Sequence, residues 1–256
     1  MIAWPTALLI VALLPVLTVF RRARVRPVRR GNRFRHLATT ALWRFGVPVP
    51  VVLLLAGRLP ALAAMPPEFR PAARWMGVAD DGPLLVGGMV AGALLGMGAA
   101  TAITAWRASR RRPAVYWFGE FAELEATTRA DRGWAAVLSF VAGVTEEAYF
   151  RLLLPLLATM AWPGDGPGGM PGAAVGFAGS ALLFGAAHRY QGWRGMATTT
   201  VVAVGTTGLY LASGSLLLAM GYHALIDLGS LVVRPWVRQV VGRRSARHAR
   251  TRDGSG

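Results

Sequence analysis

Three pairs of side chains, each separated by four residues, place ionisable groups inside an otherwise strongly apolar chain. Four residues are about one turn of an α-helix, so the members of each pair lie on one helix face. An ionisable group in a lipid-spanning helix is energetically unfavourable and usually faces a wet or protein-lined interior. Three helices could therefore direct acid, base and hydrogen-bonding groups at one cavity. The pairs are Glu147 with Arg151, preceded by Glu146, then Phe184 with His188, and His223 with Asp227.

The two adjacent glutamates are expected to do different work, because neighbouring side chains on a helix point about 100° apart. Glu147 lies one turn before Arg151, so it can pair with that cation and stay ionised. Glu146 has no partner in its own helix and is free to act as a general base on water. The competing interpretation is a buried ion-pair network that only orients helices.

The two histidines in apolar segments have alternative interpretations. His188 follows three small residues that would allow close helix approach, although an interfacial histidine that touches lipid headgroups would also fit. His223 and Asp227 fall near the middle of a predicted span. There they could bind a metal, or orient a substrate carbonyl and stabilise an oxyanion. The alternative for this pair is a satisfied polar contact that bridges two helices.

The composition indicates an integral membrane protein. Of the 256 residues, 54% are hydrophobic and the mean hydropathy is +0.43, whereas soluble domains are roughly 45–50% apolar. Several apolar stretches reach the roughly 20 residues that cross a bilayer, which disfavours a soluble helical bundle. The absence of cysteine excludes disulfides, thiolate metal sites and cysteine nucleophiles.

The charged residues are almost all arginines, and they point to a membrane surface as the partner. The chain has 28 basic residues, all arginine, against 12 acidic ones, for a net charge of +16. The arginines cluster between apolar segments, as anchoring to an anionic bilayer requires, so no nucleic-acid partner is expected. The absence of lysine and the abundance of Ala, Gly and Arg are typical of a high-GC bacterial genome.

We expect an all-α fold, a polytopic transmembrane helix bundle of about seven or eight spans around an intramembrane polar cavity. The apolar segments run over 2–20, 38–57, 83–106, 134–162, 173–188, 195–211 and 213–233. The segment 134–162 is too long for one ordinary span at about 1.5 Å per residue. It is expected either to tilt or to break near Glu146 into two helices.

The distribution of arginine predicts how these spans are threaded. Eight arginines fall in 21–37, six in 107–132 and seven from Arg234 onward, whereas 163–172 has none. Seven spans with the N-terminus outside put every Arg-rich stretch on the cytoplasmic side, as the positive-inside rule requires. The expected location is the bacterial cytoplasmic membrane, with the C-terminus in the cytoplasm. Within 114–132, aromatic residues lie near acids, so this piece is expected to lie on the membrane surface or to be a solvated connector.

The three motifs, in this order, resemble the CPBP (CAAX protease and bacteriocin-processing, Abi) family of intramembrane endopeptidases, which includes the type II CAAX prenyl proteases. The resemblance rests on the EExxxR motif that begins at Glu146, the FxxxH motif that ends at His188, and the HxxxD motif that begins at His223. It extends to Gln191-Gly192 and covers about half of the chain. The expected regions are N-terminal membrane helices (1–106), a catalytic core (107–235) and a basic, disordered cytoplasmic tail (236–256).

The resemblance implies an endopeptidase that hydrolyses a peptide bond of a membrane-associated protein or peptide. It implies that Glu146 activates the attacking water with His188, and that His223 and Asp227 bind a metal or stabilise the oxyanion. Members have been described both as metalloproteases and as glutamic-type proteases. A metal, with Zn²⁺ as the first choice, would be held by Glu146, His188, His223 and Asp227, while the same groups would serve metal-free water activation.

One position departs from the family pattern, because Asp227 stands where many CAAX proteases carry asparagine. This departure puts an amide oxyanion donor in doubt and favours metal binding or a protonated acid. Prenyl-protein substrates are not implied in a bacterium.

Two other function classes compete with the peptidase. Some members of the family are thought to act without proteolysis, as membrane scaffolds or immunity proteins, although the intact motifs argue against this. A transporter or proton relay also uses intramembrane Glu, His and Asp. Transporters tend to show paired repeats and broken helices in both halves, and no repeat is visible in this chain.

Overall fold

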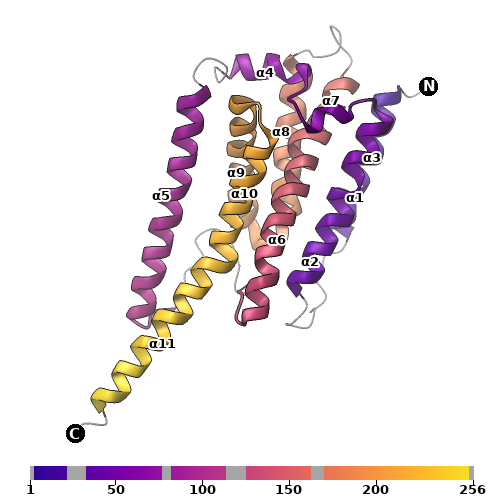
Figure 1. The fold of residues 1–256 in the computed structure, drawn as a ribbon. Helices are drawn as coiled ribbons and strands as arrows, with labels where there is room; N and C mark the ends of the chain where they lie inside the picture. Colours follow the sequence, from indigo (N-terminus) through magenta and orange to yellow (C-terminus); the bar gives the residue numbers. More distant parts are fainter. Residues whose placement is uncertain (1–2, 22–32, 77–81, 114–124, 163–169, 254–256) are drawn as a thin grey trace.

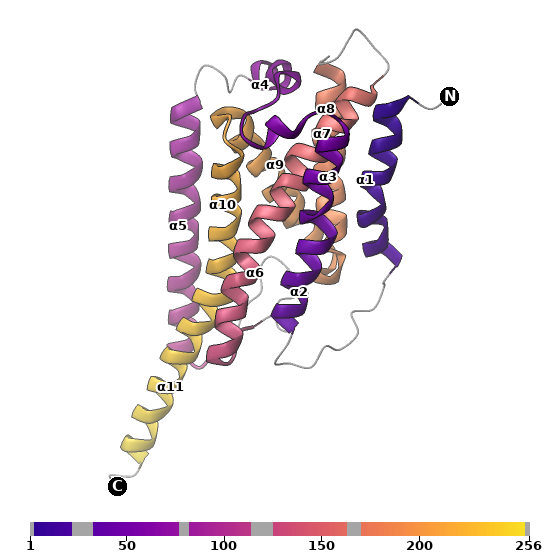
Figure 2. The same cartoon turned by 45° about the vertical axis from the view of Figure 1, so that its right-hand side comes forward.

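The computed structural model describes residues 3–21, 33–76, 82–113, 125–162 and 170–253. All regular secondary structure in these ranges is helical, which confirms the predicted all-α class. The aromatic part of the segment expected to lie on the membrane surface, 114–124, is outside the described residues. The helices stand side by side and run alternately up and down, as Figures 1 and 2 show.

The N-terminal half provides the helices around the outside of the bundle. Helix α1 (Trp4–Arg21) is followed by α2 (Arg33–Ala41), which continues through the π-helical turn η2 (Leu42–Gly46) into α3 (Pro48–Leu55). Two short 3₁₀ turns, η3 (Leu59–Leu62) and η4 (Pro67–Phe69), and the short helix α4 (Arg70–Trp75) then cross one end of the bundle (Figure 1). The long helix α5 (Gly82–Ser109) returns to the other end.

The C-terminal half has four long helical segments, and the three motifs lie on or directly after three of them. The first is α6 (Arg129–Glu147), η6 (Ala148–Leu153) and α7 (Leu154–Ala161), and the second is α8 (Met170–Ala187). The 3₁₀ turn η7 (Arg189–Gln191) leads into α9 (Gly192–Ser213). The last segment is α10 (Leu216–Leu228), η8 (Gly229–Val233) and α11 (Arg234–Asp253). Every apolar segment predicted from the sequence corresponds to one of these helices or to one in the first half.

The long segment around Glu146 does not break into two separate helices. The chain stays helical from Arg129 to Ala161, and the α-helix widens into the π-helical turn η6 directly after Glu147. A π-helical turn inserts an extra residue per turn, and such turns occur frequently at functional sites. The extra residue changes the rotation of every side chain that follows, including Arg151.

The tail is helical where the sequence predicted disorder from residue 236. Helix α11 continues from η8 without a break and extends as far as Asp253. Arginine and alanine are good helix formers, and the tail contains a single glycine, Gly242, before Asp253. A helix that is already nucleated by α10 is easily propagated through such a sequence.

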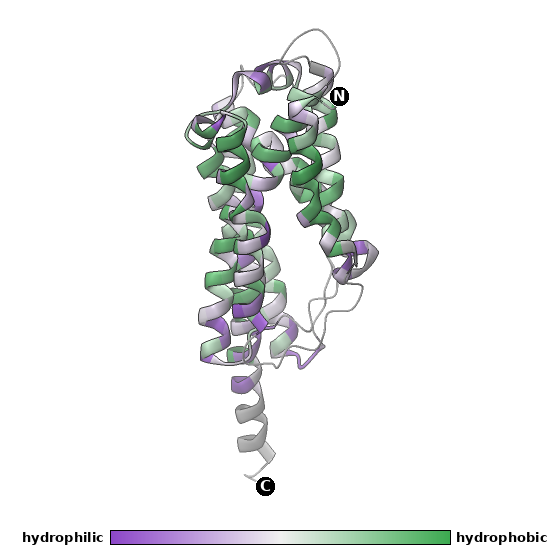
Figure 3. Cartoon of the chain, turned by 90° about the vertical axis from the view of Figure 1, so that its right-hand side faces the viewer, coloured by the Kyte–Doolittle hydropathy of each residue, from purple (hydrophilic) through white to green (hydrophobic). Residues whose placement is uncertain are grey.

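The outer faces of the bundle are apolar. Three helical segments are long and apolar enough to cross a membrane: Arg33–Leu55, Gly82–Ser109 and Leu216–Ser245. Large apolar side chains on the outside are strongly exposed, among them Leu84 at 80% and Leu217 at 76%, and hydrophobic residues cover much of the helices in Figure 3. An apolar surface of this extent is typical of a bilayer-embedded protein. The exact number of spans stays a prediction.

The helix ends next to the Arg-rich stretches of the sequence lie at the same end of the bundle. The end of α5 and the starts of α2 and α6 gather where α11 projects (Figure 2). Helix α4 and the end of α7 lie at the opposite end (Figures 1 and 2). The fold therefore has the alternating arrangement on which the predicted threading depends.

Candidate active site

A close contact between α6 and α10 sets the frame of the candidate site. A Cβ atom at Gly143 would lie 2.8 Å from the carbonyl oxygen of Met220 and 2.9 Å from the Cβ of Ala224. Only glycine therefore fits between the two helices at this point. Gly143 lies one turn before Glu147, and Met220 lies three residues before His223. The contact thus brings the first and the third motif together.

Glu147 is the centre of the buried part of the site. One carboxylate oxygen accepts a hydrogen bond from Nδ1 of His223 on α10 at 2.7 Å, and the other lies 3.0 Å from Nε of Arg151. The side chains of Glu147 and Arg151 are 0% and 1% exposed. The predicted Glu147–Arg151 pair is therefore present and buried. The contact from Glu147 to His223 was not predicted, because it joins two helices that are far apart in the sequence.

Arg151 is held by groups from three helical segments. Besides Glu147, its Nε donates a hydrogen bond of 2.9 Å to the hydroxyl oxygen of Thr206 on α9. Its guanidinium carbon lies 4.4 Å from the centre of the Phe184 ring on α8, which is a cation–π distance. The sequence shows Thr206 only as one of several threonines in an apolar segment, so it did not point to this contact.

His188 has one ring nitrogen fixed and the other available. Its Nδ1 lies 2.8 Å from the carbonyl oxygen of Phe184, one turn earlier in α8. A carbonyl oxygen only accepts, so Nδ1 carries the proton and Nε2 of the neutral ring bears a lone pair. The ring also lies against Phe184, with centroids 4.6 Å apart. The FxxxH motif therefore sets both the tautomer and the orientation of this histidine.

Glu146 and Asp227 form the accessible side of the cluster. Both are half-buried, as is His188. Glu146 lies within electrostatic range of His188, His223, Asp227 and Glu147. Within the described ranges its carboxylate makes no direct hydrogen bond or ion pair. Asp227 places a carboxylate oxygen 3.6 Å from Nε2 of His223, which is longer than a hydrogen bond.

The six predicted site residues thus converge from α6, η6, α8 and α10, and they fall into two groups. Glu147, Arg151 and His223 are buried and hold one another in place. Glu146, His188 and Asp227 are more accessible and are not locked by such contacts to each other. An unbonded carboxylate beside an imidazole with a free lone pair can take a proton from a water molecule. The arrangement is therefore suited to general-base chemistry.

Two neighbouring residues on the turn η7 belong to the same site and were not predicted as site residues. The amide nitrogen of Gln191 donates a hydrogen bond of 3.0 Å to the hydroxyl oxygen of Tyr190. The Tyr190 ring lies 5.7 Å from that of His188, and the residue is within electrostatic range of Glu146 and Asp227. The side chain is exposed, and an ordinary phenol is protonated at neutral pH, so this group is a hydrogen-bond donor.

The described side chains do not form a ready-made metal site. Among the residues that the structure describes, no group of three or more His, Asp and Glu side chains could hold a metal ion together. Both oxygens of Glu147 and Nδ1 of His223 are engaged with each other or with Arg151, so these atoms are not free to bind a metal. A zinc ion held by Glu146, His188, His223 and Asp227 stays a prediction, and no step is derived through it.

Two pockets among the described residues lie away from this cluster. One lies between α1 and the helical segment α2–η2–α3, and the other is lined by α5, α10 and η8. Neither is lined by any of the six candidate residues. The polar cavity predicted around the motifs stays a prediction.

An all-α bundle with apolar outer faces and an internal cluster of ionisable side chains defines a polytopic membrane protein with a buried polar site. Residues 129–229 match the family model described as type II CAAX prenyl endopeptidase Rce1-like. This part of the chain is therefore an Rce1-like domain of the CPBP family, and all six candidate residues lie within it. No curated protein and no solved structure matches the chain.

The family match supports a membrane-embedded protease of the CAAX type that acts on a peptide substrate. The roles of the individual residues stay predictions, as do the boundaries 1–106, 107–235 and 236–256.

Proposed function

We propose that this protein is an intramembrane endopeptidase in which Glu146 activates the attacking water with the help of His188. The observation that carries the proposal is the contrast between two adjacent glutamates. Glu147 is fully buried and held by an arginine and a histidine, whereas Glu146 is half-buried and has no direct partner among the described residues. Of these two carboxylates, only that of Glu146 is free to exchange a proton with water.

The reaction begins with water between Glu146 and the substrate carbonyl carbon. Glu146 accepts one proton as the water oxygen forms the new C–O bond, and the carbonyl oxygen becomes an oxyanion. When the C–N bond of the tetrahedral intermediate breaks, the leaving amine takes up that proton. The free Nε2 lone pair of His188 accepts a hydrogen bond from the same water and orients it. The protonated Glu146 then delivers that proton to the leaving amine as a general acid.

The oxyanion needs hydrogen-bond donors, and two side chains offer them. Nε2 of His223 lies 3.6 Å from a carboxylate oxygen of Asp227, an ion-pair distance longer than a hydrogen bond, so a proton on this nitrogen can turn toward the oxyanion. The Tyr190 hydroxyl accepts its own hydrogen bond from Gln191, so its proton is also available. A phenol donor would take over the role of the asparagine amide that Asp227 replaces.

We also propose the side of the membrane from which the substrate reaches the site. The turn that carries Tyr190 joins α8 to α9 at the Arg-rich end of the bundle. The positive-inside bias makes that end cytoplasmic. The substrate would then be a membrane protein or peptide whose cleaved bond is reachable from the cytoplasm or the inner leaflet of a bacterial cytoplasmic membrane.

The proposal is tested by comparing membrane proteomes of cells that carry the wild type, Glu146→Gln or Glu125→Gln. Glu125 is a carboxylate outside the cluster that pairs with Arg238, so its variant is the control. We expect specific membrane peptides to remain uncleaved only with Glu146→Gln, and the purified protein to restore cleavage in vesicles. If the Glu146→Gln cells show the wild-type peptide pattern and phenotype, the protein acts as a scaffold instead of a protease.

A further inference from the structure

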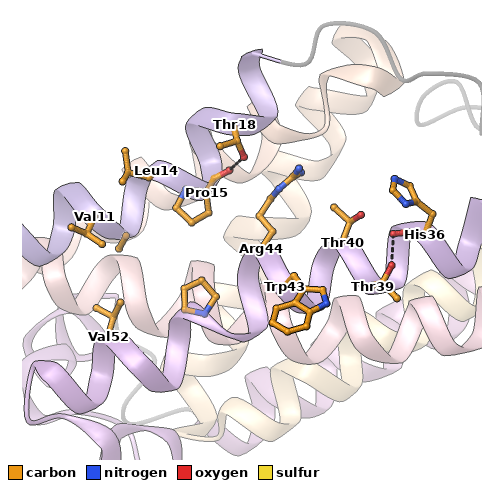
Figure 4. Close-up of a pocket in the computed structure, with 12 residues that line it drawn as sticks. Val11, Leu14, Pro15, Thr18, His36, Thr39, Thr40, Trp43, Arg44 and Val52 are labelled. Carbon is orange, nitrogen blue, oxygen red and sulfur yellow. Dashed lines mark hydrogen bonds between the residues drawn. The ribbon is translucent and has the colours of Figure 1, made fainter.

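A laterally open groove separates α1 from the segment α2–η2–α3, and none of the six candidate residues lines it. Its volume is about 620 Å³, within the roughly 300–1,000 Å³ typical of small-molecule sites. Figure 4 shows the residues that line it. Val11, Leu14 and Trp43 are each more than half exposed at its rim, while Ala12 and Val52 form a buried floor.

The groove has one apolar half and one polar half. Along both walls the lining residues change from apolar to polar in the same direction. On α1, Val11 and Leu14 precede Thr18, and on the facing helix Val52 lies at the end away from His36 (Figure 4). The polar end of each wall therefore lies toward the Arg-rich end of the bundle. His36 lies three residues from the start of α2, and Arg44 lies roughly 12 Å deeper than His36 at about 1.5 Å per residue.

The polar half of the groove contains one permanent cation, Arg44. Arg44 extends across it toward α1, near Pro15 and Thr18, and His36 lies near its Arg-rich mouth (Figure 4). None of the twelve residues that line the groove is acidic. The hydroxyls of Thr18 and Thr39 donate to carbonyls of their own helices, so they offer only their oxygen atoms. The groove therefore presents a guanidinium and an imidazole at one end and an apolar trough at the other.

We propose that this groove binds one anionic phospholipid of the leaflet at the Arg-rich end. The acyl chain lies along Val11, Leu14 and Val52, and the phosphate is engaged by Arg44, with His36 nearer the mouth of the groove. An arginine fork matches phosphate geometry, and its long stem lets the guanidinium reach up toward the headgroup level. A zwitterionic lipid would fit the trough equally well, but its positive headgroup would not complement the groove.

The site is separate from the candidate active site, although one side chain touches both regions. The hydroxyl of Tyr149 in η6 donates a hydrogen bond to the carbonyl oxygen of Ala12 in the groove floor. Tyr149 itself lies in the π-helical turn that follows Glu147. A bound lipid would therefore stabilise the position of α1 against η6 without contacting the six catalytic candidates.

The proposal can be tested by native mass spectrometry of the purified full-length protein, titrated with phosphatidylglycerol or with phosphatidylcholine of the same chain length. The variants are Arg44→Gln, which removes the charge in the groove, and Leu14→Trp, which fills its apolar half. Arg35→Gln is the matched control, because Arg35 is on the same helix but lies over the Trp134 ring instead. Folding of each variant is checked by circular dichroism.

We expect the wild type and Arg35→Gln to bind phosphatidylglycerol about tenfold more tightly than phosphatidylcholine, the effect of one charge-assisted contact. Arg44→Gln should lose this preference, and Leu14→Trp should lose the bound lipid with all charges intact. If the Arg44→Gln variant does not fold, the Leu14→Trp variant tests by itself whether the lipid occupies the groove. Equal binding of the two lipids in the wild type would overturn the proposal. The same conclusion would follow if Arg35→Gln lost as much affinity as Arg44→Gln, or if a second copy of the chain occupied the groove.

Discussion

Glu147 accepts a hydrogen bond of 2.7 Å from Nδ1 of His223, and this contact joins two helices whose residues are 76 positions apart. Since the same carboxylate also pairs with Arg151, a single buried glutamate fixes both an arginine on its own helix and a histidine on α10. The catalytic candidates next to it, Glu146 and Asp227, are each within four residues of this contact. Their positions therefore depend on it.

Replacing Glu147 should destabilise the protein far more than replacing Glu146. In Glu147→Gln, Arg151 loses its carboxylate partner while it stays buried, and breaking such a pair typically costs about 3–5 kcal/mol. Glu146→Gln removes no direct contact and should unfold within about 0.5 kcal/mol of the wild type. Thermal or denaturant unfolding in detergent measures the difference. Equal stability of the two variants would show that the buried pair does not contribute as argued.

Thr206→Val should lower stability through the same arginine. The threonine oxygen accepts from Nε of Arg151, and loss of an acceptor for a buried charged donor costs about 1–3 kcal/mol. The matched control is Thr207→Val, a buried neighbour on α9 that faces another direction. Comparison of the two melting temperatures tests the effect. A larger loss in the control would place the important hydroxyl at Thr207.

Gly143→Ala should separate α6 from α10 and displace His223. The new methyl would lie 2.8 Å from a backbone oxygen that cannot move aside, so both stability and cleavage should fall. Gly133→Ala on the same helix is the control, because nothing lies within 4 Å of its Cβ position. There alanine should be neutral or stabilise by up to about 1 kcal/mol. A neutral Gly143→Ala in both assays would contradict the close contact.

Tyr190→Phe should slow catalysis without weakening substrate binding. Removing one oxyanion donor lowers kcat by about 10²–10³-fold in a well-studied hydrolase, and we expect a loss of at least tenfold with KM unchanged. Tyr222→Phe on α10 is the control. Kinetics on a substrate found by the proteome comparison measures both constants. A rise in KM alone would assign Tyr190 to substrate binding instead.

The membrane topology should follow the distribution of arginine along the chain. A reporter fused after Gly256 should read cytoplasmic, and one inserted within Gly164–Gly169 should read extracytoplasmic, because an odd number of spans separates them. Alkaline phosphatase and fluorescent protein fusions measure this directly. If both positions read on the same side, the predicted span count between them is wrong, and the access route to His188 changes with it.

The sequence by itself determined the helices, their order and the faces that carry the three motifs, because these depend on local periodicity. It also determined the Glu147–Arg151 pair, whose members are one turn apart. The family match over 129–229 agrees with the motifs. The sequence did not reveal the π-helical turn after Glu147, since widening a helix by one residue leaves its apolar pattern almost unchanged. It also did not reveal that the basic tail is helical.

Only the tertiary structure decided which residues from different helices meet. Two contacts depend on how far neighbouring helices are rotated and shifted against each other: that of Glu147 with His223 and that of Arg151 with Thr206. That register is set by close packing, such as the contact of Gly143 with Met220 and Ala224 on α10. Because a shift of one residue rotates a side chain by about 100°, motif spacing within each helix cannot specify these contacts, and the packed bundle must.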